Sequence, residues 1–144
     1  SGSGMNAIRY VASTFGRVPD VKVTLFSVSG NPKAELFKSQ KEHEEAQAKT
    51  ADSSRAIMAE ARKTLVQGGF PGDHIENRLV EPQNARVSDL ILEEQKTGNY
   101  SAIVAGRLRL SRAEEFLFGN VAVRLARQAG CPVWVIGENL PSPP

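Results

Sequence analysis

Residues 100–106, Tyr-Ser-Ala-Ile-Val-Ala-Gly, and residues 131–136, Cys-Pro-Val-Trp-Val-Ile, decide the fold. Each stretch is short, uncharged and rich in apolar or β-branched residues, as is typical of a buried strand in a parallel sheet. Upstream, the same signals predict strands over residues 21–28 and 75–81. Helical patterns alternate with these strands, over residues 5–15, 34–67 and 85–97 and from Asn120 to Gln128. The alternation predicts an α/β fold, with an open, mainly parallel, twisted sheet and helices on both faces.

The predicted helix over residues 34–67 has two unlike halves. Its first half is mostly charged, which indicates a solvated face. Its second half is expected to bury four apolar side chains at helical spacing: Ile57, Met58, Ala61 and Leu65. Between the halves, residues 52–54 are expected to break or kink the helix.

The predicted helix over residues 85–97 is expected to begin at Asn84 as its N-cap and to end at Gly98. Its inward stripe is predicted to comprise Val87, Leu90, Ile91 and Glu94.

Length, charge and hydropathy limit the classes of protein to which this chain can belong. The chain has 144 residues and a formal net charge of +2, which fits one globular domain and gives no indication of nucleic-acid binding. No apolar run has the length of a membrane span, and no secretory signal is evident, so we expect a cytoplasmic protein. We expect the domain over residues 5–137, with a linker or expression scar at 1–4 and a proline-rich tail at 138–144.

A candidate binding site follows the strand that ends at Ala105. Ligands of open α/β sheets bind beyond the carboxyl ends of the strands. Gly106 and Gly119 would let the backbone approach a ligand, and a helix starting at Asn120 would direct free amides at an anion such as phosphate. On spacing alone, a tight turn at Gly106 and a helix junction at Gly119 are the favoured explanation.

The loop from Gly106 to Val121, together with the final strand, closely resembles the universal stress protein family. The nucleotide loop of that family is G-x-x-G, nine residues, then G-[ST], and its last strand is commonly C-P-V-x-V-V. Gly106 matches the first glycine and Gly119 the third. The resemblance covers essentially residues 5–137 and implies a flavodoxin-like or Rossmann-like fold of the adenine nucleotide alpha hydrolase type.

The resemblance also implies a site and a partner. ATP or AMP, with Mg²⁺, would bind with Val28 and Ala105 near the base and sugar. Gly106, Gly119, Asn120 and the Val121 amide would contact the phosphates. Family members commonly dimerise through the last strand, which here implies a homodimer edge made of Val133, Trp134, Val135 and Ile136.

Three departures from the family pattern put nucleotide binding in question. Arg109 stands where the family has its second loop glycine, and Asn120 replaces a serine or threonine. The family's first central strand ends in an acidic residue near the nucleotide, and we find no such strand pattern before Met5. We expect its place to be taken by a separate segment, by an exchanged element of a second copy, or by direct pairing of the flanking strands, because unpaired buried backbone groups are costly.

Other reactive residues form no convincing catalytic set. Arg107, Arg109 and Arg112 could bind phosphate, but a solvated cluster paired with glutamates is the favoured explanation. His43 and His74 share no metal-ligand spacing and are expected to be exposed, and Cys131 is expected to be a small buried residue.

The predicted function is therefore a stress-response regulatory module with a degenerate ATP/AMP pocket, and not an enzyme. The alternatives are a dimeric interaction or scaffold protein that binds no nucleotide and, least favoured, a slow ATPase.

Overall fold

Helices and strands alternate along the chain in the computed structural model, which describes residues 2–28, 40–82, 84–106 and 121–137. The helices are α1 (Gly2–Phe15), α2 (Gln40–Gln67), α3 (Val87–Gly98) and α5 (Val121–Gln128), with a short 3₁₀ turn, η2, at Gly72–His74. The strands are β1 (Val23–Val28), β2 (Ile75–Val80), β3 (Ile103–Gly106) and β4 (Val133–Ile136). The predicted α/β class with parallel strands is confirmed.

The described strands form two separate parallel pairs. β1 pairs with β2 from Val23 opposite Ile75 to Val28 opposite Val80, and β3 pairs with β4 from Ile103 opposite Val133 to Gly106 opposite Ile136. No described residue of β1 is paired in a ladder with β3. Direct pairing of the strands that flank the expected gap is therefore not what this part of the chain adopts.

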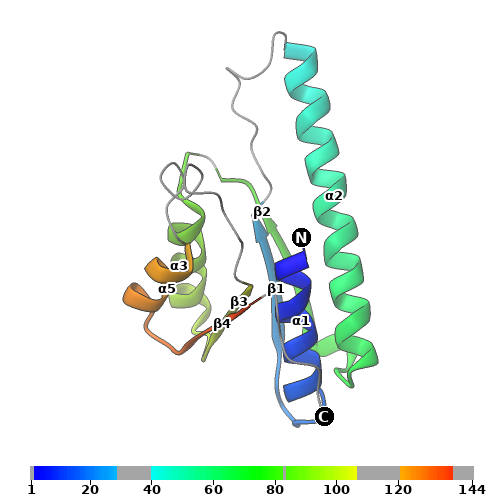
Figure 1. Cartoon of the computed structure of the whole chain (residues 1–144), viewed down its shortest axis with the longest axis vertical. Helices are drawn as coiled ribbons and strands as arrows, with labels where there is room; N and C mark the ends of the chain where they lie inside the picture. The colour runs from blue at the N-terminus through cyan, green and yellow to red at the C-terminus, as the bar shows by residue number, and fades with distance from the viewer. Residues whose placement is uncertain (1, 29–39, 83, 107–120, 138–144) are drawn as a thin grey trace.

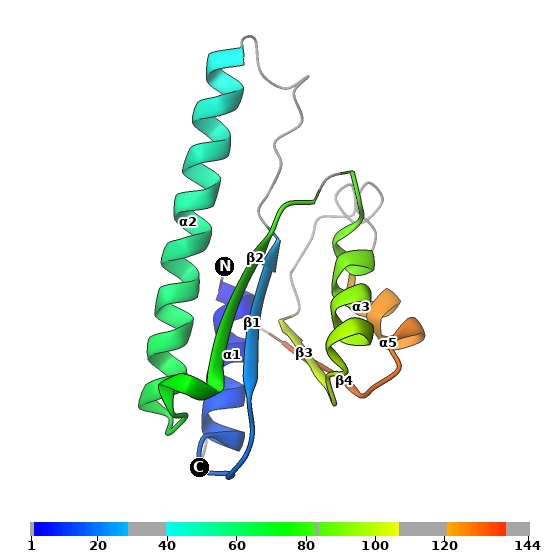
Figure 2. The ribbon, with the colours of Figure 1, turned by 180° about the vertical axis from the view of Figure 1, so that it is seen from behind.

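The helices cover both faces of the strands (Figures 1 and 2). α1 and α2 lie on one face, and α3 and α5 lie together on the other. α1 contacts α2, β3 and β4, so this one helix links the two strand pairs. The predicted arrangement with helices on both faces is confirmed.

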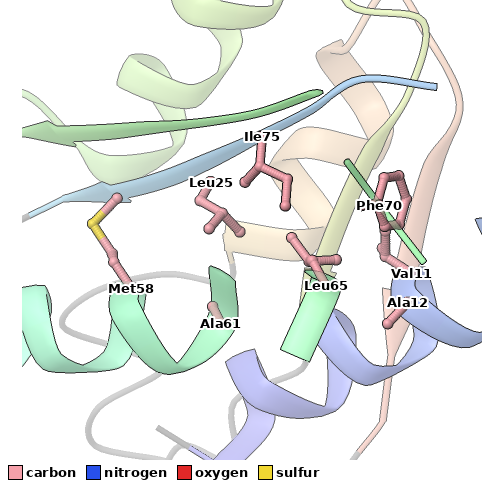
Figure 3. Close-up of a cluster of buried hydrophobic side chains, with 8 residues drawn as sticks. All are labelled: Val11, Ala12, Leu25, Met58, Ala61, Leu65, Phe70 and Ile75. Atoms are coloured by element: carbon pink, nitrogen blue, oxygen red, sulfur yellow. The ribbon is translucent and has the colours of Figure 1, made fainter. Parts of the chain in front are cut away.

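The main core lies between α1, α2 and the β1–β2 pair (Figure 3). Eight buried side chains form this core. Side chains on the helices recur on one face at a period of about 3.6 residues and those on the strands at a period of 2, so each element directs one face toward the others. The eight residues are Val11, Ala12, Leu25, Met58, Ala61, Leu65, Phe70 and Ile75. Leu65 is fully buried, at 0% exposure, and lies at the centre of this contact.

Helix α2 corrects two predictions. It continues without interruption through residues 52–54, where a break or kink was expected. Met58, Ala61 and Leu65 are buried as predicted, but Ile57 is 42% exposed. Successive helical residues are rotated by about 100°, so Ile57 lies at the flank of the buried stripe rather than on it.

The ends of α2 and α1 touch through their backbones. A Cβ atom on Gly16 would overlap the carbonyl oxygen of Gly68, and Gly69 has a φ of 115°, which favours glycine. Arg62 stabilises the segment between α2 and β2. Its guanidinium donates to the carbonyl oxygens of Gly72 at 2.7 Å and Ile75 at 2.8 Å.

The boundaries of other helices also differ from the predictions. α1 starts at Gly2, so residues 2–4, expected to lie outside the fold, belong to its first turn. α3 has Arg86, not Asn84, at its N-cap. Asn84 instead has a φ of 66° in the preceding turn, and Val87 is 40% exposed rather than inward. Asn99 ends α3 in the left-handed conformation that asparagine tolerates.

Candidate functional site

The candidate site lies at the carboxyl ends of the parallel strands. Val28 is the last residue of β1 and stands opposite Val80, and Gly106 is the last residue of β3 and stands opposite Ile136. Within each pair the two strands run parallel, so their carboxyl ends lie on the same side, and open α/β sheets bind their ligands on that side.

Four of the seven predicted site residues fall in the described part of the chain. Val28, Ala105, Gly106 and Val121 are each partly exposed, and Val121 is the first residue of α5. The other three, Arg109, Gly119 and Asn120, lie outside the described residues, as do Arg107 and Arg112.

A pocket of about 440 Å³ lies at the same edge, beyond the end of β2. It is open to solvent and bordered by the end of β2, the loop after it and α3, through Leu79, Val80, Glu81, Pro82, Ala85 and Leu90. Most of this lining is apolar, and Glu81 provides an acidic group. No binding motif in the sequence pointed to this loop.

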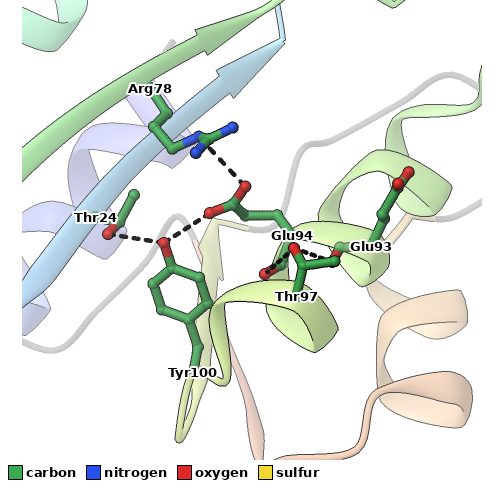
Figure 4. Close-up of polar contacts among 6 residues, drawn as sticks. All are labelled: Thr24, Arg78, Glu93, Glu94, Thr97 and Tyr100. Atoms are coloured by element: carbon green, nitrogen blue, oxygen red, sulfur yellow. Dashed lines mark hydrogen bonds and ion pairs between the residues drawn. The ribbon is translucent and has the colours of Figure 1, made fainter.

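A polar network joins the two strand pairs (Figure 4). The Tyr100 hydroxyl donates to Glu94 Oε2 at 2.7 Å and shares a second hydrogen bond, at 3.0 Å, with Thr24 Oγ1 of β1. Glu94 also forms an ion pair with Arg78 of β2, with Oε1 3.3 Å from Nε. The network connects β1, β2, α3 and the segment just before β3.

The environment of Tyr100 favours its neutral form. Burial raises the pKa of the Tyr100 hydroxyl above its usual value. The Glu94 carboxylate raises this pKa further, because it accepts the hydroxyl proton and repels a phenolate, whereas the hydrogen bond with Thr24 lowers it. Tyr100 is therefore a structural hydrogen-bond donor at neutral pH.

The described residues offer no cluster of three or more metal-binding side chains. Cys131 is half-buried, not buried as predicted, because it precedes β4 instead of lying within it. His74 is partly buried in the turn before β2, not exposed as predicted, and His43 lies where side chains are not described. In the described chain, no helix is both long and apolar enough to cross a bilayer.

The predicted dimer edge divides between core and surface. Trp134 packs on α1, with its ring centroid 5.8 Å from that of Tyr10 and 5.3 Å from that of Phe15. Ile136 is buried, whereas Val135 is 41% exposed. β4 has a ladder partner only on its β3 side among the described strands.

Comparison with known proteins agrees with this architecture. The sequence model of the universal stress protein family matches residues 1–137, so the chain belongs to that family. One similar solved structure is that of a universal stress protein in complex with cAMP. It has a TM-score of 0.66 and 19% sequence identity, and the match covers 96% of this chain and 90% of that one. No individual curated protein sequence matches the chain.

Sequence reasoning missed the polar network. Thr24 and Tyr100 are 76 residues apart, and neither stands in a motif. Only the spacing of Glu94 and Tyr100, six residues apart around the end of α3, offered a local signal.

Proposed function

We propose that this universal stress protein is a regulatory module that binds an adenine nucleotide at the carboxyl ends of β1 and β3. The observation that carries the proposal is the placement of Val28 and Gly106 at the ends of parallel strands. α5 begins at Val121, so its N-terminal amides supply a further group suited to phosphate. The cAMP complex of a protein with the same fold supports the choice of an adenine nucleotide.

ATP or AMP, with Mg²⁺ accompanying ATP, is the proposed ligand. Val28 and Ala105 would border the base and sugar, and Gly106 and the Val121 amide would lie toward the phosphates. Arg109 and Asn120 replace smaller or hydroxylated residues of the family loop, so we propose that the pocket is degenerate and its affinity reduced.

The proposed role is binding without turnover. The described residues contain no cluster of acidic or histidine side chains that could hold Mg²⁺ for phosphoryl transfer. A slow ATPase is the least favoured alternative. Phosphate release from ATP at a rate above that of the Gly106→Ala variant would establish it.

The test is calorimetric titration of the folded protein with ATP plus Mg²⁺ and with AMP. Gly106→Ala adds a methyl group at the proposed phosphate side and should weaken binding at least several-fold. Gly137→Ala is the matched control, because a Cβ there meets no atom within 4 Å, and its affinity should be unchanged. Arg109→Ala should leave binding unchanged or strengthen it if the side chain reduces affinity as proposed, and should weaken binding if the side chain contacts phosphate.

The second candidate is a homodimeric scaffold that binds no nucleotide. It is favoured by β4, whose outer edge has no described ladder partner and which exposes Val135. Absence of a binding signal at millimolar AMP from a folded dimer would establish this candidate instead. Val135→Lys should then shift the sedimentation coefficient to that of a monomer.

A further inference from the structure

β2 lies at an edge of its strand pair. Among the described strands it has a ladder partner only in β1, so its other side presents unpaired backbone groups. Four of its six residues are exposed, and Figure 2 shows no described element drawn across it between α2 and α3. We call this outer side of residues 75–80 the β2 edge. An exposed edge of this kind can pair with a strand of another chain.

The side chains of β2 alternate between the two faces of its strand pair. Ile75 lies in the main core with α2, so Asn77 and Leu79 lie on the same face as Ile75. Glu76 and Arg78 lie on the opposite face, where Arg78 forms its ion pair with α3. The charged side chains of β2 are therefore gathered on one face, and they carry opposite charges.

The charges of the β2 edge are complementary to those of a second copy of the same edge. Antiparallel pairing of two β2 edges about Asn77 sets each Glu76 opposite the Arg78 of the other copy. Both ion pairs then form on one face of the sheet, since directly opposite residues of an antiparallel pair point to the same side. Opposite charges at such positions stabilise a strand pair, whereas like charges destabilise it. An edge that carried lysines alone would instead repel its own copy.

The other face of β2 is compatible with the same register. Leu79, which is 36% exposed, would lie opposite Ile75 of the other copy and so gain an apolar neighbour. The two Asn77 side chains, which are both donors and acceptors of hydrogen bonds, would meet at the two-fold axis. Arg78 can take part because its ion pair with Glu94 engages Nε, and its side chain is 48% exposed.

We propose that the β2 edge binds a second copy of this chain in an antiparallel, two-fold contact centred on Asn77. This contact differs from a dimer through β4, because β2 and β4 belong to different strand pairs. One short strand from each copy makes a small interface, so the association is weak and is populated at high protein concentration. Copies that also paired through β4 would assemble beyond a dimer, because each chain would then have two different two-fold contacts.

Disulfide trapping tests the register. In the proposed pairing Asn77 lies directly opposite its own equivalent, with a Cα–Cα separation of about 4.5–5.5 Å, which a disulfide can span. The whole chain carrying Cys131→Ser and Asn77→Cys should form a covalent dimer at millimolar concentration in a glutathione redox buffer. Asp73→Cys is the matched control, because Asp73 is also exposed but the register holds its two copies well beyond the span of a disulfide. Its dimer yield should be at least ten-fold lower, and adding Val135→Lys should leave the Asn77→Cys yield unchanged.

Charge reversal in the trapping protein tests the complementarity. Glu76→Lys sets two positive charges opposite one another and should lower the yield of covalent dimer at least five-fold, and Arg78→Glu should do the same with negative charges. A mixture of these two variants restores both ion pairs, so mixed dimers, identified by their mass, should exceed the dimers of either variant alone. Glu76→Lys leaves the ion pair of Arg78 with Glu94 in place, so its result stands even if Arg78→Glu does not fold.

Three results would overturn the proposal. Equal yields from Asn77→Cys and Asp73→Cys would mean that the disulfides form by random collision. The absence of a covalent dimer from Asn77→Cys, in a protein whose circular dichroism is that of the folded state, would mean that the charged side chains protect the β2 edge from pairing. An unchanged or higher yield with Glu76→Lys would mean that charge complementarity between two copies does not hold the contact together.

Discussion

The two halves of this molecule bury their strands to different extents. The β1–β2 pair shares an eight-residue core with α1 and α2, whereas Leu125 and Ile136 are the buried hydrophobic residues described in β3, α5 and β4. The first pair is covered by the 28-residue helix α2. The second pair has the eight-residue α5 beside it and depends on α1 from the other half. The strand pair with the longer covering helix has more buried side chains around it, although both pairs are rich in apolar residues.

Two side-chain contacts are prominent among those that link the halves. Trp134 of β4 packs on Tyr10 and Phe15 of α1, and Tyr100 reaches Thr24 of β1. If this comparison is right, stability should respond strongly to changes in the main core and more weakly to changes in the links and in the second half.

The largest effect is expected for Leu65→Ala. Leu65 is fully buried in the main core, and its truncation should lower the free energy of unfolding by about 2–5 kcal/mol. Chemical denaturation followed by circular dichroism measures this change. Ile57→Ala in the same helix is the control and should cost under about 1 kcal/mol, because Ile57 is 42% exposed.

Leu125→Ala sharpens the contrast, since Leu125 is also fully buried but lies in the second half. Its cost should be smaller than that of Leu65→Ala, because less densely covered surroundings can relax around the cavity. Equal losses of unfolding free energy in the two variants would show that the halves are equally well packed and would contradict the difference described above.

Trp134→Ala should have the next largest effect. It removes two aromatic contacts of a partly exposed side chain, which we expect to cost about 2 kcal/mol. Hydrogen exchange should quicken at Ile103–Gly106 and Val133–Ile136 more than at Val23–Val28. Trp134→Phe keeps an aromatic ring and should recover part of the loss, and uniform quickening across all strands would contradict a separate role for this link.

Arg62→Ala should cost about 1–2 kcal/mol, because it leaves the carbonyl oxygens of Gly72 and Ile75 without their guanidinium donors. Thermal unfolding monitored by circular dichroism gives the change. Arg62→Lys retains the charge but not the two-pronged geometry, and should therefore recover less than half of the lost stability. Full recovery by lysine would assign the effect to charge alone.

Local patterns predicted the elements of both halves, but not how deeply each residue is buried. The strand ends at Val28 and Gly106 follow from runs of apolar residues closed by turn signals, and these ends place the candidate site. Ile57 and Val87 match helical stripes yet are exposed, because burial at the flank of a stripe depends on which neighbouring element happens to lie beside it. The separation of β1 from β3 follows from pairing across distant segments, and the Tyr100 network depends on contacts 76 residues apart, which no periodicity encodes.

The smallest predicted effect concerns Tyr100→Phe, which removes the hydrogen bonds to Glu94 and Thr24 while the ion pair of Glu94 with Arg78 remains. At pH 7 the cost should be about 0.5–1.5 kcal/mol. Because folding raises the pKa of Tyr100 above its ordinary value of 10.0, the unfolded chain loses this proton first as pH increases. The contribution of the raised pKa is therefore complete below pH 10 and is lost as pH rises through the folded-state pKa.

The difference in unfolding free energy between the wild type and Tyr100→Phe should accordingly narrow above pH 10, measured by urea denaturation at a series of pH values. Tyr10→Phe, measured at pH 7, is the control for removing a tyrosine hydroxyl outside this network. A Tyr100→Phe difference that stays constant to high pH would mean that the hydroxyl does not keep its proton through contact with Glu94. The contact of Tyr100 with β1 would then rest on packing of the ring rather than on its hydroxyl.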